Sequence, residues 1–126
     1  MEQIREMIQA KLSQIEDLEV GVAIPDGMVE QGTTYFGYEL QETYLGSDLG
    51  KHYTMEVSLT GRIVRRKNAD ENATQIVDTA LENIKEKLKE LNFKYTYNDI
   101  NTDDNFKKIL VKGLVRYNEL NNEFIV

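Results

Sequence analysis

The segment YTYNDINTDDNF, residues 95–106, is dense in side chains that could bind a cation. Carboxylate and amide oxygens recur at every second residue, as they do in a calcium-binding EF-hand loop, at Asp99, Asn101, Asp103 and Asn105. Such a loop also needs Gly at its sixth position and a bidentate Glu at its twelfth, but here those positions hold Asp104 and Leu110. Asp and Asn also close turns by bonding to their own backbone, and apolar residues alternate on both sides as in strands. We therefore interpret the segment as the turn between two strands, without a metal.

A second segment, GSDLGKH from Gly46 to His52, has some features of a phosphate-binding loop. That loop has the pattern G-x-x-x-x-G-K-S/T between a strand and a helix, so that backbone amides meet the phosphates. Here three residues separate the glycines, His52 replaces Ser or Thr, and a strand follows. The sequence favours a plain loop between two strands.

Catalytic groups do not converge elsewhere in the sequence. His52 is the one histidine, and none of the serines lies in a nucleophile elbow. Paired carboxylates such as Asp103 and Asp104 fall in turns and at the ends of elements, where charge is normally solvated. Without cysteine there is no disulfide, thiolate metal site or thiol nucleophile. We expect no catalytic residue, metal or cofactor, and hence a protein that is not an enzyme.

The composition indicates one domain, residues 1–126, with 40% hydrophobic and 29% charged residues. No apolar run approaches the roughly 18 residues of a membrane helix, and the N-terminus is amphipathic, unlike a signal peptide. A net charge of −7 repels nucleic acid unless a local basic patch opposes it.

Apolar spacing predicts two amphipathic helices. The first spans about residues 2–18, and its buried face holds Ile4, Met7, Ile8, Leu12 and Ile15. The second follows a cap at Asn68 or Asp70 and ends at a left-handed Asn92. Its apolar stripe comprises Ile76, Val77, Ala80, Leu81, Ile84, Leu88 and Leu91.

Alternation at period two predicts three strands before the second helix and three after it. The order α-β-β-β-α-β-β-β lacks the βαβ alternation of a parallel sheet. We therefore predict an α+β fold, in which a mostly antiparallel β-sheet carries both amphipathic helices on one face.

The third strand is long for so small a protein. From Tyr53 to Arg65 it would extend about 43 Å at about 3.3 Å per residue, whereas a compact chain of this size is about 36 Å across. It must bend at a bulge, for which Gly61 is a candidate, or overhang the body. Overhanging strands and the apolar C-terminus, Phe124 to Val126, would offer an unpaired edge to a neighbour. The alternative is a bulged strand with a frayed tail.

Cations gather at the end of this strand, in GRIVRRKN. They are either solvated charges that prevent edge pairing or a contact with an acidic partner, which could be another copy of the chain. Four cations without stacking aromatics are too few to indicate nucleic acid binding.

The whole arrangement resembles the tail terminator proteins of long-tailed bacteriophages. Four segments carry the resemblance beside the N-terminal helix: VEQGTTYFGYELQETY after a single Ile-Pro, YTMEVSLTGRIVRR, NATQIVDTALENIKEKLKELNFKY and KKILVKGLVRYNEL. The resemblance spans nearly the full chain through element order and pattern. It implies a small α+β protomer that forms a hexameric ring on the tail tube, ends its polymerisation and joins the tail to the head connector.

The resemblance also implies a place and partners. The protein would be made in the host cytoplasm and work in the virion, at the head–tail interface. Its partners would be itself, the tail tube protein and the head-completion or connector protein, with DNA only as passing cargo and no membrane. The predicted contact residues are Leu45, Gly46, Ser47, Asp48, Leu49, Gly50, Lys51, His52, Tyr53, Arg62, Arg65, Arg66, Phe124 and Ile125. The alternatives are another head–tail joining or minor tail protein, or a cytosolic small-ligand-binding domain or enzyme.

Overall fold

The computed structural model describes residues 2–23, 28–44, 54–69, 71–100 and 106–125. Its elements are α1 (Glu2–Leu12), β1 (Glu19–Val22), β2 (Thr34–Tyr44), β3 (Thr54–Arg66), α2 (Ala73–Glu90), β4 (Lys94–Ile100), β5 (Phe106–Asn118) and β6 (Glu123–Ile125). The predicted order of elements and the α+β class are confirmed.

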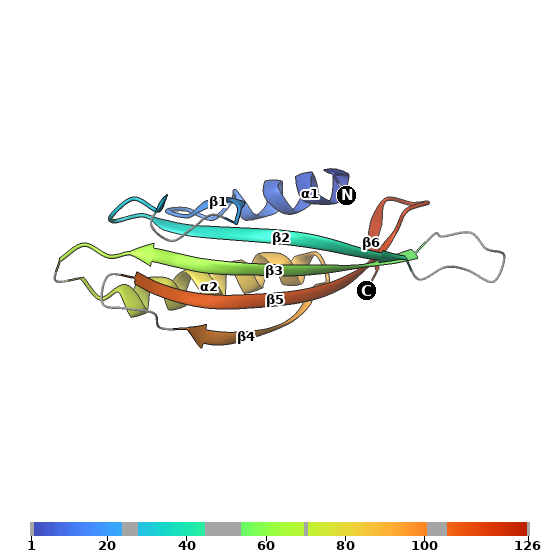
Figure 1. The fold of residues 1–126 in the computed structure, drawn as a ribbon. Helices are drawn as coiled ribbons and strands as arrows, with labels where there is room; N and C mark the ends of the chain where they lie inside the picture. The colour runs from blue at the N-terminus through green and yellow to red at the C-terminus, as the bar shows by residue number, and fades with distance from the viewer. Residues whose placement is uncertain (1, 24–27, 45–53, 70, 101–105, 126) are drawn as a thin grey trace.

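The strands form one sheet in the order β1-β2-β3-β5-β4, and β6 pairs with the end of β5. Only the short β1 runs parallel to its neighbour, whereas the other pairs are antiparallel. Both helices cover one face. Figure 1 shows α1 along the β1–β2 side and α2 behind β3 and β5. The opposite face of the sheet, which neither described helix covers (Figure 1), we call the open face.

A single core lies between the sheet and the helices. Alternate residues of β3 face the helices and are buried, as the alternation predicted: Met55, Val57, Leu59 and Ile63. The two helices cover them with side chains that recur at helical spacing, namely Ile4, Ile8 and Leu12 from α1 and Val77, Ala80, Leu81, Ile84 and Leu88 from α2. A polar bridge orients α1 on the sheet, because Gln9 donates to the Val20 carbonyl and accepts from the Tyr38 hydroxyl.

The predicted end of the first helix, at about residue 18, is wrong. Regular helix stops at Leu12, and the next residues make the tighter i→i−3 bonds from Gln14 N to Lys11 O and from Ile15 N to Leu12 O. Asp17 then adopts a left-handed conformation with φ of 58°. Ile15 is still buried although it lies beyond the helix. The helical spacing of apolar residues therefore extended past the last helical residue, and the predicted helix was too long.

The predicted cap of the second helix is also wrong. The N-cap is Asn72, whose Oδ1 accepts a hydrogen bond from Gln75 N at 3.2 Å. Asn68 belongs to the preceding connection, where its backbone N–H donates to Glu71 at 3.2 Å. Asp70 lies outside the described residues. The sequence prediction considered only Asn68 and Asp70, although Asn72 is also a residue type that caps helices.

The end of α2 and the strands after it agree with expectation. Asn92 has φ of 65°, the predicted left-handed stop. β4 and β5 pair without interruption, so strands and not helices flank residues 101–105. Asp99, the first position of the rejected calcium loop, pairs with Ile109 within this ladder. Residues 101–105 themselves lie outside the described part of the chain.

The predicted bulge at Gly61 is absent. All 13 residues of β3 pair with β5, and 11 of them also pair with β2 in unbroken register. The strands instead run along the long axis of an elongated molecule (Figure 1). Gly61 is needed for packing, because a Cβ there would lie 2.7 Å from both Cε1 and Cζ of Phe36.

Replacing Gly61 tests this packing role. We expect Gly61→Ala to lower the free energy of unfolding by about 1–3 kcal/mol, because the buried Phe36 ring must move. The adjacent exposed Thr60 gives a matched control, for which Thr60→Ala should change stability by less than about 0.5 kcal/mol. Urea titrations measure both, and an equally stable Gly61 variant would contradict the assigned role.

The helix cap gives a second test. Asn72→Ala removes the acceptor for the Gln75 amide and should cost about 1 kcal/mol in chemical unfolding. Asn68→Ala alters the other exposed asparagine before the helix and should cost less than about half of that. The reverse order of effects would refute Asn72 as the cap.

Candidate interaction surfaces

The three predicted strand-end arginines have different environments. Arg62 is exposed on the open face, between Gly37 of β2 and Leu110 of β5. Arg66 is exposed at the end of β3, where its carbonyl accepts from Gly32 N at 2.6 Å. Arg65 points to the helix side and is half-buried. Of these three arginines, only Arg62 and Arg66 are therefore exposed.

Arg65 forms a bidentate ion pair with Glu71. Its Nε donates to Oε1 and its Nη2 to Oε2, both at 2.8 Å, and its Nη1 donates to the Thr34 hydroxyl at 2.8 Å. The hydrogen bonds from Arg65 hold the pKa of Glu71 below its ordinary value, and the same pairing raises the pKa of Arg65. The cluster joins the start of β2, the end of β3 and the approach to α2. Arg65 therefore has a structural role in the protomer, which sequence reasoning missed because Glu71 carries no recognisable motif.

The other predicted contact residues are placed as follows. Residues 45–53 lie outside the described part of the chain. Phe124 is half-buried, with ring centroids 6.0 Å from Phe93 and 5.3 Å from Tyr117. Ile125 lies on the open face opposite Arg116 and is 36% exposed. The last strand is thus paired and anchored on β5.

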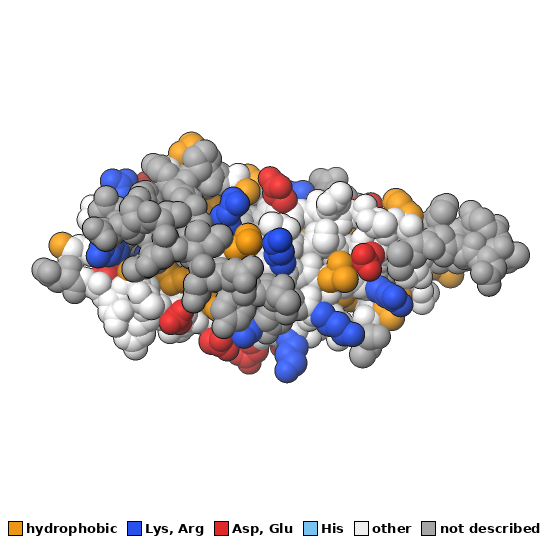
Figure 2. All heavy atoms as spheres, turned by 60° about the horizontal axis from the view of Figure 1, so that its bottom comes forward, with side chains coloured by type: hydrophobic (Ala, Val, Ile, Leu, Met, Phe, Trp, Pro, Cys, Tyr) orange, Lys and Arg blue, Asp and Glu red, His pale blue; other side chains and the backbone are white. Residues whose placement is uncertain are grey.

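The open face carries a cluster that we call the basic patch: Lys94, Lys112, Leu114 and Arg116. Leu114 is 42% exposed, with Lys94 directly opposite on β4 and a cation two residues away on either side along β5. No ion pair joins these three cations to another described residue. Figure 2 shows Lys and Arg side chains spaced between apolar and acidic ones on one face of the molecule. The alternation at period two in KGLVR indicated that Lys112, Leu114 and Arg116 share one face of the strand. Only the buried residues on the other face were used to predict the strand.

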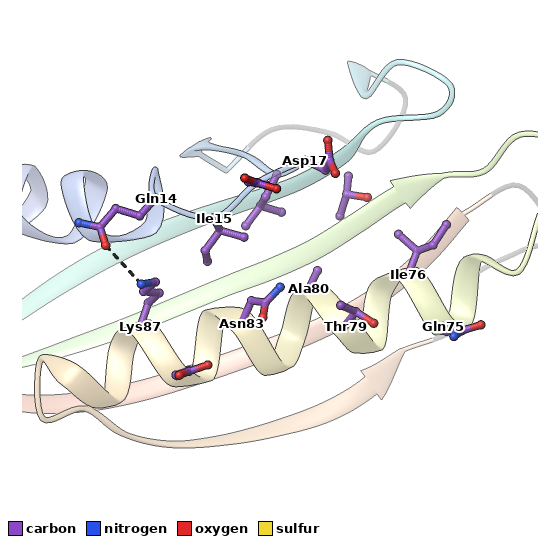
Figure 3. A pocket seen from close by; sticks show the side chains of 13 residues that line it. Gln14, Ile15, Asp17, Gln75, Ile76, Thr79, Ala80, Asn83 and Lys87 are labelled. Carbon is purple, nitrogen blue, oxygen red and sulfur yellow. Dashed lines mark hydrogen bonds between the residues drawn. The ribbon is translucent and has the colours of Figure 1, made fainter.

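A groove lies on the helix side, between α2 and the turn that follows α1. Because α1 ends early, this space of about 560 Å³ stays open. Its apolar lining comes from Ile15, Leu18, Ile76 and Ala80. Figure 3 shows Ile15 and Ala80 on opposite sides of it, and Lys87 Nζ reaching across to Gln14 Oε1 at 3.3 Å. We call this the interhelical groove.

Acidic residues border the groove, namely Glu16, Asp17 and Glu86. None of them forms an ion pair with another described residue, although several cations of the helix layer do. Lys11 and Lys87 lie 3.7 and 3.8 Å from Glu90, and Lys85 lies 3.5 Å from Glu82. Among the described residues, Glu16, Asp17 and Glu86 at the groove and Lys94, Lys112 and Arg116 on the open face thus form no ion pair, although Asp17 acts electrostatically on Arg65.

The described residues contain no group of three or more His, Cys, Asp or Glu side chains arranged to hold a metal. Within the same residues, neither helix combines the length and hydropathy needed to cross a membrane. No protein-family model matches the chain, and no curated protein matches its sequence.

The ion pair gives a test with a pH dependence. Because folding lowers the pKa of Glu71, its stabilising effect is full above the unfolded pKa and is lost as pH falls through the folded pKa. We expect Glu71→Gln to cost about 1–3 kcal/mol of unfolding free energy at neutral pH and progressively less in acid. Exposed Glu30 is the control, and Glu30→Gln should change stability by less than about 0.5 kcal/mol throughout. A pH-independent cost would contradict an ionic contribution.

Proposed function

We propose that this protein is a bacteriophage virion structural protein that caps the tail tube. It would end tube polymerisation and join the tail to the head connector as a ring, with the tube and head-completion proteins as partners. The observation that supports this best is the one-sided layering of an α-β-β-β-α-β-β-β chain, which leaves the open face available for contacts. The elements that carry the resemblance to tail terminators are present in that order.

Ring formation requires two different surfaces on each copy, because head-to-tail contacts are heterologous. The described residues offer several. Arg62 and Arg66 are exposed near one end of the strands, and the basic patch lies further along the open face. β1 pairs only with residues 35–38 of β2, so no described strand covers the outer edge of β2 over residues 39–41. Such an edge can accept a strand from a neighbour.

The charge of the chain is compatible with DNA as passing cargo. A net charge of −7 gives a ring whose overall field repels phosphates, so DNA would slide rather than bind. The basic patch would oppose this sliding if it lined a channel. We therefore place the patch at protein contacts.

The interhelical groove favours one candidate of another class, a cytosolic domain that binds a small ligand. Its volume of about 560 Å³ lies within the usual range of such sites, about 300–1,000 Å³. Native mass spectrometry of the purified protein separates the two functions. A retained small molecule on a monomer would favour the ligand-binding domain, whereas a ring would favour the cap.

Tube length tests the capping function directly. A tail tube protein is polymerised with and without this chain, and electron microscopy measures the tube lengths. We expect wild-type protein to shorten the tubes, and uncapped lengths in its presence would refute the function.

Charge reversal then tests the predicted contact residues. Arg62→Glu with Arg66→Glu should weaken capping at least about tenfold, as reversals at charged contacts do. Arg5→Glu with Lys89→Glu makes the same charge change on the helix side and should leave capping intact. Unchanged tube length and ring formation with the first pair would exclude Arg62 and Arg66 from the contacts.

A further inference from the structure

The basic patch presents Leu114 with cations on three sides, whereas on the β3 side Ser58 lies opposite Leu114 and Glu56 lies opposite Arg116. Lys94 lies directly across from Leu114, at a Cβ separation of about 5 Å for such pairs. Lys112 and Arg116 lie about 7 Å away along β5, because residues two apart on a strand share a face. An exposed leucine enclosed in this way suits a partner that offers an apolar hollow with an acidic border.

The interhelical groove has these properties. Ile15 and Ala80 are each only 8% exposed, whereas Glu16, Asp17 and Glu86 are exposed at its border. The cation of the lining, Lys87, is already engaged by Gln14 and lies near Glu90. The groove thus combines an apolar lining with unpaired carboxylates.

The basic patch and the interhelical groove are complementary surfaces of the same chain, and they lie on opposite faces of the protomer. We propose that the basic patch of one copy docks into the interhelical groove of a second copy, with Leu114 against the apolar lining and the flanking cations against the acidic border. This inference adds a specific subunit contact to the proposed ring and so depends on that function for its biological setting. A net charge of −7 makes two copies repel each other in any orientation, and the local complementarity of patch and groove offsets that repulsion in this one.

The contact is heterologous, because the patch and the groove are different surfaces. A docked pair still presents one free groove, on the copy whose patch is docked, and one free patch, on the other copy, so association continues until a ring closes or a filament grows. Its attraction depends on charges at the surface. Added salt should therefore weaken it, since the screening length falls to about 10 Å at 0.1 M ionic strength.

Charge exchange provides the test. Sedimentation velocity and native mass spectrometry follow self-association of the full chain at low and high salt. Lys112→Glu with Arg116→Glu reverses the patch, and Glu16→Lys with Glu86→Lys reverses the groove. Each pair alone should weaken association at least about tenfold. A chain carrying all four changes should associate again, because the reversed patch matches the reversed groove.

Two controls separate docking from folding and from overall charge. Glu30→Lys with Asp78→Lys makes the same charge change at exposed positions outside the groove and should not weaken association in the way the groove pair does. Thermal unfolding by circular dichroism verifies that every variant is folded. Failure of the folded fourfold variant to recover association would overturn the proposal.

Other outcomes distinguish this contact from the proposed function. A wild-type chain that stays monomeric in low salt at its highest soluble concentration would overturn the docking. Rings that persist in both reversed pairs and still cap tubes would also overturn it, while leaving the function intact. Salt-sensitive association by patch and groove, without any effect on tube length, would support the docking and refute the capping function.

Discussion

Burial of one face of the sheet under two amphipathic helices is the constraint on which the rest of this structure depends. β3 has a neighbour on both sides over most of its length, so its backbone groups are paired and its alternate side chains must face either the core or the open face. A shift of one residue would expose Val57, Leu59 and Ile63. The register, and with it the position of every charge on the open face, follows from this burial.

The same alternation sorts the charges of the strands. Arg65 faces the helix side, where a half-buried cation requires a partner, and Glu71 provides a carboxylate with both oxygens engaged. Arg62 and Arg66 face the other way and are exposed. The three arginines of GRIVRR look equivalent in the sequence. In the structure, Arg65 stabilises the protomer, whereas Arg62 and Arg66 can contact another molecule.

The two faces that result differ in kind, which suits a protein that works by assembly. The open face retains unpaired cations around Leu114, and the helix side retains unpaired acids around an apolar groove. Opposite charge on opposite faces favours head-to-tail rather than face-to-face contact, because like patches repel. The proposed cap of the tail tube would need contacts of this directional type.

Sequence by itself determined the class, the order of elements and most of the core, because helical and strand periodicities are local consequences of which face is buried. It also placed the stop at Asn92, where a left-handed residue closes α2. It misplaced the end of α1 and the cap of α2, which depend on individual hydrogen bonds within one turn, and it left open whether β3 bends at Gly61, which the packing of Phe36 against that residue decides. The interhelical groove, the Arg65–Glu71 pair and the patch around Leu114 were decided by the tertiary structure alone. The groove joins residues 14–18 to α2, the patch joins Lys94 to β5, and Arg65 bonds the distant Thr34 as well as the nearby Glu71, so packing of the helices and strands is needed to complete each of them.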